Sequence, residues 1–229
     1  MFEIERHRHE YLYNYVTVVP GVIPLETCNR LNVAIGDHIR DGVPRNVQHE
    51  GQGTRGELDY GGAYRHHLFD GSHIRAHFPY LMGVYQVLRP LVSLITCCDV
   101  VHSPYPVSDV NIKAYPSAGG TIGWHEDTNG ITCLIYLTTN TEGQLLLDVP
   151  VSKPWMDEVR FERRTIQPVA GSMLLMQGRK VKHMSTPMAS EVKNVVVYNF
   201  YQRGDTWRPT NFDELVYEGK PTREACSRP

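Results

Sequence analysis

From residue 110 onward, short apolar segments alternate with turn-forming residues. The segments read VNIKAY, TCLIYLT, QLLLDV, SMLLMQ and NVVVYNFY, and Gly, Asn, Pro or Ser residues separate them. They are rich in β-branched and aromatic side chains, which is typical of an antiparallel sandwich or jelly roll and not of βαβ units. The pattern therefore predicts a mainly β chain with a double-stranded β-helix, the cupin-like jelly roll, at residues 110–203.

Helical spacing dominates the chain before this region. Residues 23–39 carry apolar side chains at three- and four-residue intervals, with Pro24 and Glu26 near the start, which predicts a helix. Residues 77–97 predict a second, buried helix that is broken near Pro90. A short β-branched run at residues 15–19 indicates a strand.

The remaining parts of the chain show no clear period. Residues 41–70 are rich in Gly, Arg, His and Tyr, so they predict a long irregular segment, which in a compact domain usually has a function. No linker composition is visible, and residues 1–229 are expected to form one domain. We expect residues 1–109 to give N-terminal helical support that packs on one sheet, and residues 204–229 to form a polar tail that frays near its end.

Composition and charge argue against some classes of binding partner and some cellular locations. The chain has 23 Lys and Arg against 25 Asp and Glu, a formal net charge of −2, which argues against a broad basic surface for nucleic acid. Its five cysteines are odd in number and form no C-x-x-C, which favours a reducing compartment. The charged N-terminus does not resemble a signal peptide, and a cytoplasmic protein without a membrane segment is expected.

Two of the 11 histidines stand out by their position in the strand pattern. His125 and Asp127 are two residues apart, so in an extended chain both side chains point to the same side. His183 follows the strand SMLLMQ, and only short strands lie between it and Asp127. Two histidines and one carboxylate form the facial triad of non-haem Fe(II) oxygenases. A surface turn with a hydrogen-bonded histidine is the alternative interpretation of His-x-Asp alone.

A lysine and two tyrosines are further candidates for the site. Lys193 begins the apolar strand NVVVYNFY, and a lysine that enters a barrel interior needs an anionic partner there. Tyr115 and Tyr136 lie on the strands before and after the His-x-Asp pair. The alternatives are an exposed lysine at a strand start and two tyrosines that pack in the core with a solvated hydroxyl.

The order of these residues resembles the Fe(II)/2-oxoglutarate-dependent dioxygenases, and within them the prolyl-hydroxylase-like branch. Tyr115-Pro116 precedes His-x-Asp by about ten residues, as in that branch, and Lys193 matches the basic residue that follows the distal histidine. The resemblance covers roughly residues 110–201 and includes Pro187, four residues after His183. The segment at residues 143–146 is an imperfect copy of the Gly-Gly-x-Leu element of the branch.

The resemblance implies the ligands and the reaction. Fe(II) would be held by His125, Asp127 and His183, and the cosubstrate 2-oxoglutarate by Lys193 with the two tyrosines. O2 would be the second cosubstrate, ascorbate a candidate reductant, and succinate and CO2 the coproducts. Because Asp127 is retained, hydroxylation of an unactivated C–H is favoured over halogenation, while desaturation and ring closure stay open.

The substrate is less well defined by the sequence. The stretch at residues 51–72 is a candidate lid, and the chain has no extra peptide-recognition domain, so a small molecule such as an amino acid or a biosynthetic intermediate is expected. The alternatives are a prolyl or peptidyl hydroxylase and, in a different class, a non-catalytic jelly-roll binding module. The sequence does not indicate an oligomeric state. Candidate substrate contacts are Tyr64, Arg65, His66, Asn111, Trp124 and Asn199.

Overall fold

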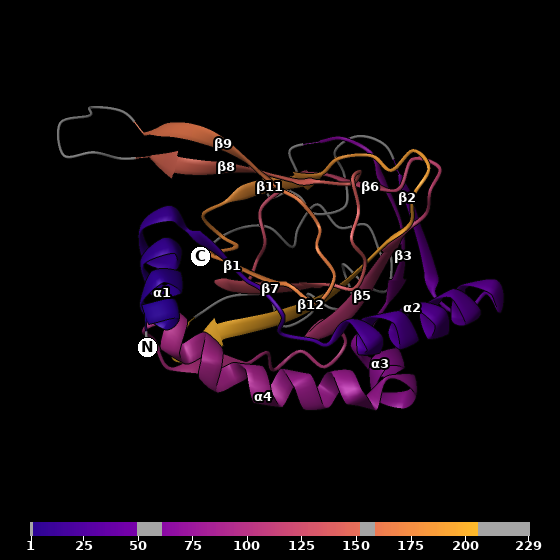
Figure 1. Ribbon diagram of the computed structural model, residues 1–229, viewed down its shortest axis with the longest axis horizontal. Coiled ribbons are helices and arrows are strands. Elements are labelled where there is room, and N and C mark those ends of the chain that lie inside the picture. The colour runs from indigo at the N-terminus through magenta and orange to yellow at the C-terminus, as the bar shows by residue number, and fades with distance from the viewer. Residues whose placement is uncertain (1, 50–60, 152–158, 206–229) are drawn as a thin grey trace, which may run out of the picture.

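The structure is a computed structural model that describes residues 2–49, 61–151 and 159–205 (Figure 1). The predicted tail lies almost entirely outside these residues, as do residues 51–60 of the candidate lid. Four helices occur in the described ranges: α1 (Phe2–Asn14), α2 (Leu25–Arg40), α3 (Gly71–His77) and α4 (Pro79–Thr96). The strands are β1 (Val16–Val19), β2 (Arg45–His49), β3 (Tyr64–Phe69), β4 (Val100–His102), β5 (Val110–Tyr115), β6 (Thr121–His125), β7 (Ile131–Tyr136), β8 (Leu145–Val151), β9 (Arg160–Ile166), β10 (Met173–Met176), β11 (Lys182–Ser185) and β12 (Lys193–Gln202).

The strands form one antiparallel sheet that curls until its two halves face each other. The strand order is β1-β10-β7-β12-β5-β3-β6-β11-β8-β9, with β2 paired to β3 and β4 paired to β12. Strands β7, β12 and β5 lie above the helices α4, α3 and α2, and strands β6, β11 and β8 lie on the opposite side of the barrel (Figure 1). This arrangement confirms the predicted mainly β fold with flanking helices.

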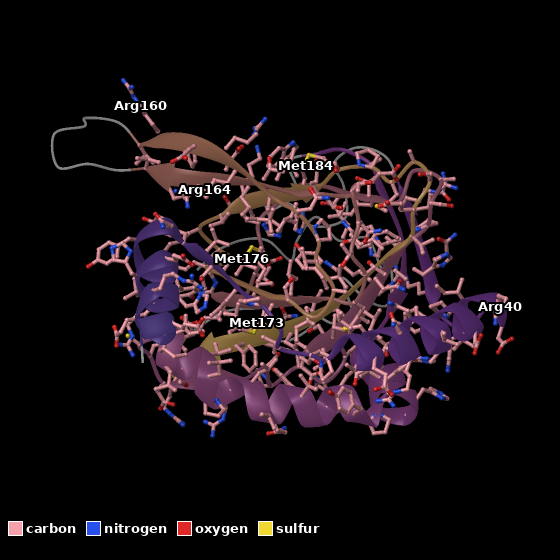
Figure 2. All side chains as sticks on the ribbon, viewed as in Figure 1. Arg40, Arg160, Arg164, Met173, Met176 and Met184 are labelled. Carbon is pink, nitrogen blue, oxygen red and sulfur yellow. The ribbon has the colours of Figure 1, made fainter. Side chains whose placement is uncertain are left out.

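Alternation along the strands builds two separate hydrophobic cores. In β10, Met173 and Leu175 belong to the core between the sheet and the helices, while Leu174 and Met176 belong to the core inside the barrel. Figure 2 shows Met176 in the space between the two halves of the sheet and Met173 nearer the helices. Because side chains alternate between the two faces of a strand, a continuous apolar run can serve both cores. The interior core surrounds the candidate site.

The helical chain bends at Phe78, between the short helix α3 and the long helix α4, and not near Pro90. Helix α4 continues through Pro90, and Phe78 has φ −129° and ψ 52°, outside the helical region. A residue that precedes proline is disfavoured in the helical conformation, so Phe78 before Pro79 is the natural place for the chain to bend. Within the described residues no single helix is long and apolar enough to cross a membrane; α3 and α4 pass that test only as a pair, bent by 112°.

The described parts of the segment 41–70, residues 41–49 and 61–70, are not irregular throughout, contrary to the prediction from their composition. They form β2 and β3, and β3 lies between β5 and β6, where it joins the two halves of the sheet. The alternating residues of β3 that face the interior include polar and aromatic ones, Tyr64 and His66, so the strand shows no hydrophobic alternation. The jelly-roll sheet thus draws on strands before residue 110 as well. Helix α1 is a further element that the sequence analysis did not identify.

Candidate metal centre and anion pocket

The predicted facial triad comes together at one end of the barrel interior. His125 is the last residue of β6, His183 lies on β11, and the two are direct cross-strand partners. Their ring centroids are 4.2 Å apart, and each Nε2 atom lies 3.8 Å from a carboxylate oxygen of Asp127. One donor atom from each of the three residues lies within 4.8 Å of the other two. Register therefore places both imidazoles and the carboxylate around a single point.

Hydrogen bonds fix which nitrogen of each histidine faces that point. The Nδ1 atom of His125 lies 2.8 Å from the carbonyl oxygen of Gly123, and Nδ1 of His183 lies 2.9 Å from that of Val181. A carbonyl oxygen can only accept, so each Nδ1 carries the proton and each Nε2 keeps its lone pair. Metal-ligating histidines are usually oriented by such a second hydrogen bond. Both rings are thus prepared to bind a cation through Nε2.

The Asp127 carboxylate is held in place by neighbours from the following strand. Thr132 donates its hydroxyl to Oδ2 of Asp127 at 2.5 Å, and Asn129 donates to the Thr132 hydroxyl at 2.8 Å. The Asp127 amide donates to the carbonyl of Gly178 at 3.1 Å. The Thr132 hydroxyl therefore occupies one side of Oδ2, and Oδ1 is directed toward His125.

Gly178 is a positioning residue for the triad. A Cβ atom at this position would lie 2.8 Å from Cβ and 2.9 Å from Oδ2 of Asp127, and it would also overlap the Thr132 hydroxyl. We expect Gly178→Ala to displace Asp127 and to weaken metal binding about 10- to 100-fold, the usual cost of disturbing residues that orient ligands. Titration of the metal-free protein with Fe(II) under anaerobic conditions measures this effect.

The matched control is Gly83→Ala. Gly83 lies in helix α4, and a Cβ atom there meets no atom within 4 Å. Alanine at a helical glycine usually stabilises a protein, so this variant should keep the iron affinity of the wild type. Equal iron affinities for the two variants would show that Gly178 does not position Asp127.

A pocket opens from the triad into the barrel and contains a buried cation. Lys193 is only 2% exposed, and its Nζ donates to the Gly143 carbonyl at 2.6 Å and to the Ser185 hydroxyl. The ammonium group also lies 4.1 Å from the centroid of the Tyr115 ring, its cross-strand neighbour. Burial, followed by repulsion from Lys113, lowers the pKa of Lys193 to about 7. Such a shift indicates a charge that lacks full compensation.

Tyr136 supplies a hydroxyl beside this cation. Its oxygen is buried and has no hydrogen-bond partner in the part of the chain that the structure describes. Burial raises the pKa of Tyr136 above its ordinary value, so the phenol stays protonated and can donate. A buried donor without a partner is costly, and an anion between Tyr136 and Lys193 would satisfy both groups. This observation fits a carboxylate ligand.

The pocket is lined by Lys113, Tyr115, Ile122, His125, Asp127, Thr132, Leu134, Tyr136, Leu145, His183, Ser185, Lys193, Val195 and Val197.

Tyr64, His66 and Asn111, three of the candidate substrate residues, are buried close to residues that line the pocket. Tyr64 and His66 are buried on β3, where the Tyr64 ring lies 6.2 Å from that of His125 and the His66 ring 5.9 Å from that of Tyr115. Asn111 is buried on the same face of β5 as Lys113 and Tyr115. None of these three side chains is among the residues that line the pocket, so their contact with a substrate stays a prediction.

Arg65, Trp124 and Asn199 are also absent from the pocket lining, and their contact with a substrate likewise stays a prediction. Arg65 and Trp124 sit between interior-facing residues of their strands, so both side chains point outward. The Trp124 ring instead lies 4.8 Å from the Arg163 guanidinium. Asn199 is buried, but its amide group donates to the Ser108 carbonyl at 2.5 Å, a contact that ties β12 to the segment before β5.

Sequence reasoning missed several residues of the site. Lys113 lines the pocket with Lys193, and the alternation of β5 places it on the same face as Tyr115. That signal was available in the sequence. Thr132 and Gly178 contact Asp127 only after the sheet has curled, so no spacing in the chain could identify them.

Comparisons with known proteins agree on the fold. No protein-family model matches the sequence, and no curated protein matches it. Among solved structures, the α-ketoglutarate-dependent non-haem epimerase SnoN from nogalamycin biosynthesis matches with a TM-score of 0.69 and 13% identity over 97% of this chain and 94% of that one. The carbocyclase SnoK from the same biosynthesis gives 0.68 and 14% over 95% and 91%. A prolyl-4-hydroxylase from Pseudomonas putida gives 0.59 and 15% over 88% and 100%.

These likenesses establish that the chain has the fold of 2-oxoglutarate/Fe(II) oxygenases. At identities of 13–15% they establish nothing about substrate or reaction. One structure of SnoN contains Fe3+, α-ketoglutarate and nogalamycin RO, so this fold can hold a metal, the keto acid and a small molecule together.

Proposed function

We propose that the chain is a non-haem Fe(II)- and 2-oxoglutarate-dependent oxygenase that oxidises a C–H bond of a small molecule. The observation that carries the proposal is one cavity with two distinct parts. His125, Asp127 and His183 converge on a metal position, and Lys193 with Tyr136 forms a buried anion site in the same cavity. A binding module of this fold has no need for both parts together.

The residues of the triad would bind Fe(II), and the hydrogen bonds around them orient these ligands. Two imidazole Nε2 atoms and one carboxylate suit Fe(II) and leave coordination positions open, which fits the facial triad. Bound Fe(II) with O2 and 2-oxoglutarate supplies the oxidising chemistry, with succinate and CO2 as coproducts. The protein contributes the fixed tautomers of His125 and His183 and the fixed orientation of Asp127.

The anion site fits the distal carboxylate of 2-oxoglutarate. Lys193 supplies the positive charge and Tyr136 a neutral donor, and Ser185 and Gly143 hold the ammonium group in position. Leu134, Leu145, Val195 and Val197 give this region apolar walls. Such walls exclude water and strengthen the charge–carboxylate interaction.

The comparisons favour a small-molecule substrate over a peptide. SnoN and SnoK match more of this chain, at higher TM-scores, than the prolyl-4-hydroxylase does. Both of those proteins come from nogalamycin biosynthesis, and a structure of SnoN contains nogalamycin RO. Hydroxylation is the reaction that we propose. Ring closure or epimerisation is the second candidate, because a carbocyclase and an epimerase share the fold.

Anaerobic addition of Fe(II) and 2-oxoglutarate to the metal-free protein tests this function. We expect a weak visible charge-transfer band that needs both components, because the keto acid must chelate the iron. A screen of free amino acids, biosynthetic intermediates and prolyl peptides for substrate-stimulated succinate release should then give its largest response with a small molecule. Folded protein that binds iron without developing the band would contradict the proposal, and stimulation by peptides alone would contradict the substrate class.

A further inference from the structure

Three histidines gather where α2 meets α3, outside the cavity described above. His38 lies in the last turn of α2, and His73 and His77 lie four residues apart on α3. Residues at this separation share one face of a helix. Helices α2 and α3 lie side by side at one end of the helical layer (Figure 1). The cluster therefore joins two helices that are separated by 30 residues of sequence.

The three rings lie within about 5 Å of one another, and one pair of their nitrogens has the spacing of ligands to one metal ion. The ring centroids are 5.1 Å apart for His38 and His73, 4.4 Å for His73 and His77, and 5.0 Å for His38 and His77. The Nδ1 atom of His38 lies 3.2 Å from Nε2 of His73. Two nitrogens at about 2.1 Å from a tetrahedral Zn(II) would lie about 3.4 Å from each other. The His38–His73 pair is therefore already spaced as a chelate.

The surroundings hold two of the three rings in this position. Phe69 and Phe78 contact both His38 and His73, with ring centroids 5.2–6.4 Å apart. Asp70 caps α3 by accepting a hydrogen bond from the His73 amide at 2.9 Å, which fixes the start of the helix. His77 is exposed, so its ring can turn toward the other two by rotation about its side-chain bonds.

The protonation state of the cluster also suits metal binding. Burial, followed by repulsion from His77 and His38, lowers the pKa of His73 below its ordinary value. Its imidazole is therefore neutral near pH 7, and the neutral ring is the form that binds metals.

We propose that His38, His73 and His77 form a second metal site, which binds Zn(II) or another divalent cation that prefers imidazole nitrogen. Water completes the coordination on the exposed side. The site has no carboxylate ligand among these three residues, unlike the triad at His125, and imidazole ligands favour Zn, Cu and Ni. A bound ion would link α2 to α3 beneath the sheet. The proposal does not depend on the oxygenase function.

Zinc titration of untagged, metal-free protein by calorimetry tests this second site. We expect two equivalents for the wild type, one at the triad and one at the cluster. His73→Phe should bind one equivalent, and its unfolding temperature should lose the cluster's share of the rise with Zn(II). His9→Phe is the matched control, because His9 is an exposed histidine outside the cluster and its ring contacts that of Tyr13.

The triad variant His183→Ala separates the two sites. It should retain one equivalent of zinc, whereas His73→Phe/His183→Ala should retain none. A wild type that binds one equivalent, together with His73→Phe that binds the same one, would overturn the proposal. Two equivalents in His73→Phe would overturn it as well, since the second ion would then lie elsewhere.

Discussion

Replacing His183 with alanine is expected to abolish turnover. His183 contributes one of three metal ligands, and its Nε2 is aimed at the metal position by the hydrogen bond from Nδ1 to Val181. Disturbing a residue that merely orients a ligand costs about 10- to 100-fold in metal affinity, so loss of a ligand should cost more than about 100-fold. The measurement is iron content after anaerobic reconstitution, followed by 2-oxoglutarate consumption and succinate release.

The control for this variant is His9→Ala, which removes an exposed imidazole from α1. It should keep full iron content and wild-type succinate release. The His183 side chain is buried, so circular dichroism must first show that the alanine variant is folded. A folded His183→Ala protein that still binds one iron and releases succinate normally would exclude this residue as a ligand.

The sequence predicted the triad because strand geometry is local. His125 and Asp127 are two residues apart, and the position of His183 after an apolar strand implied a neighbouring strand end. The structure makes His125 and His183 cross-strand partners, which is the simplest way to meet that requirement. The buried position of Lys193 could also be suspected from the sequence, because a lysine at the start of an apolar run must be either exposed or paired with an anion.

The sequence did not predict strand β3, because polar side chains lie on the face of this strand that is buried inside the barrel. Strand β3 carries Tyr64 and His66 on its buried face, so its pattern did not show the apolar alternation of a half-buried strand. For the same reason Arg65 appeared equivalent to its neighbours, although the alternation of the strand turns it outward. Polar interior positions of this kind are found at functional sites, where local pattern and fold are in conflict.

The bend at Phe78 is a second feature that the sequence did not predict correctly, for a different reason. Proline usually breaks a helix, which led to a predicted break near Pro90. Helix α4 nevertheless continues through Pro90, and its buried residues Leu88 and Val92 flank that position. The proline that does mark a boundary is Pro79, whose effect falls on the preceding residue. Pro79 and Pro90 are similar local signals for the end of a helix. Tertiary packing, with Leu88 and Val92 buried, keeps the chain helical at Pro90 and lets it bend before Pro79.

Lys193→Ala is expected to raise the dissociation constant of 2-oxoglutarate about 100-fold while iron binding stays intact. The variant removes the buried cation that would meet the distal carboxylate, and a charge-assisted hydrogen bond of this kind contributes about 1.5–3 kcal/mol. Lys180→Ala is the control, because Lys180 is exposed and contacts the Tyr15 ring. Calorimetric titration of the iron-loaded, oxygen-free protein with 2-oxoglutarate measures both variants.

The pH dependence of binding distinguishes a direct charge contact from a structural effect of Lys193. In the free protein the pKa of Lys193 is about 7, lowered by burial and by Lys113, so above pH 7 the amine is mostly neutral. Binding of a carboxylate favours the charged form, so the wild type should take up one proton, and its affinity should fall about tenfold per pH unit above 7. Titrations in two buffers of different ionisation enthalpy measure that proton directly. Lys193→Ala should show no uptake, because the group that accepts the proton is gone. If the variant kept the proton uptake and the pH slope of the wild type, the carboxylate would have to bind elsewhere in the cavity.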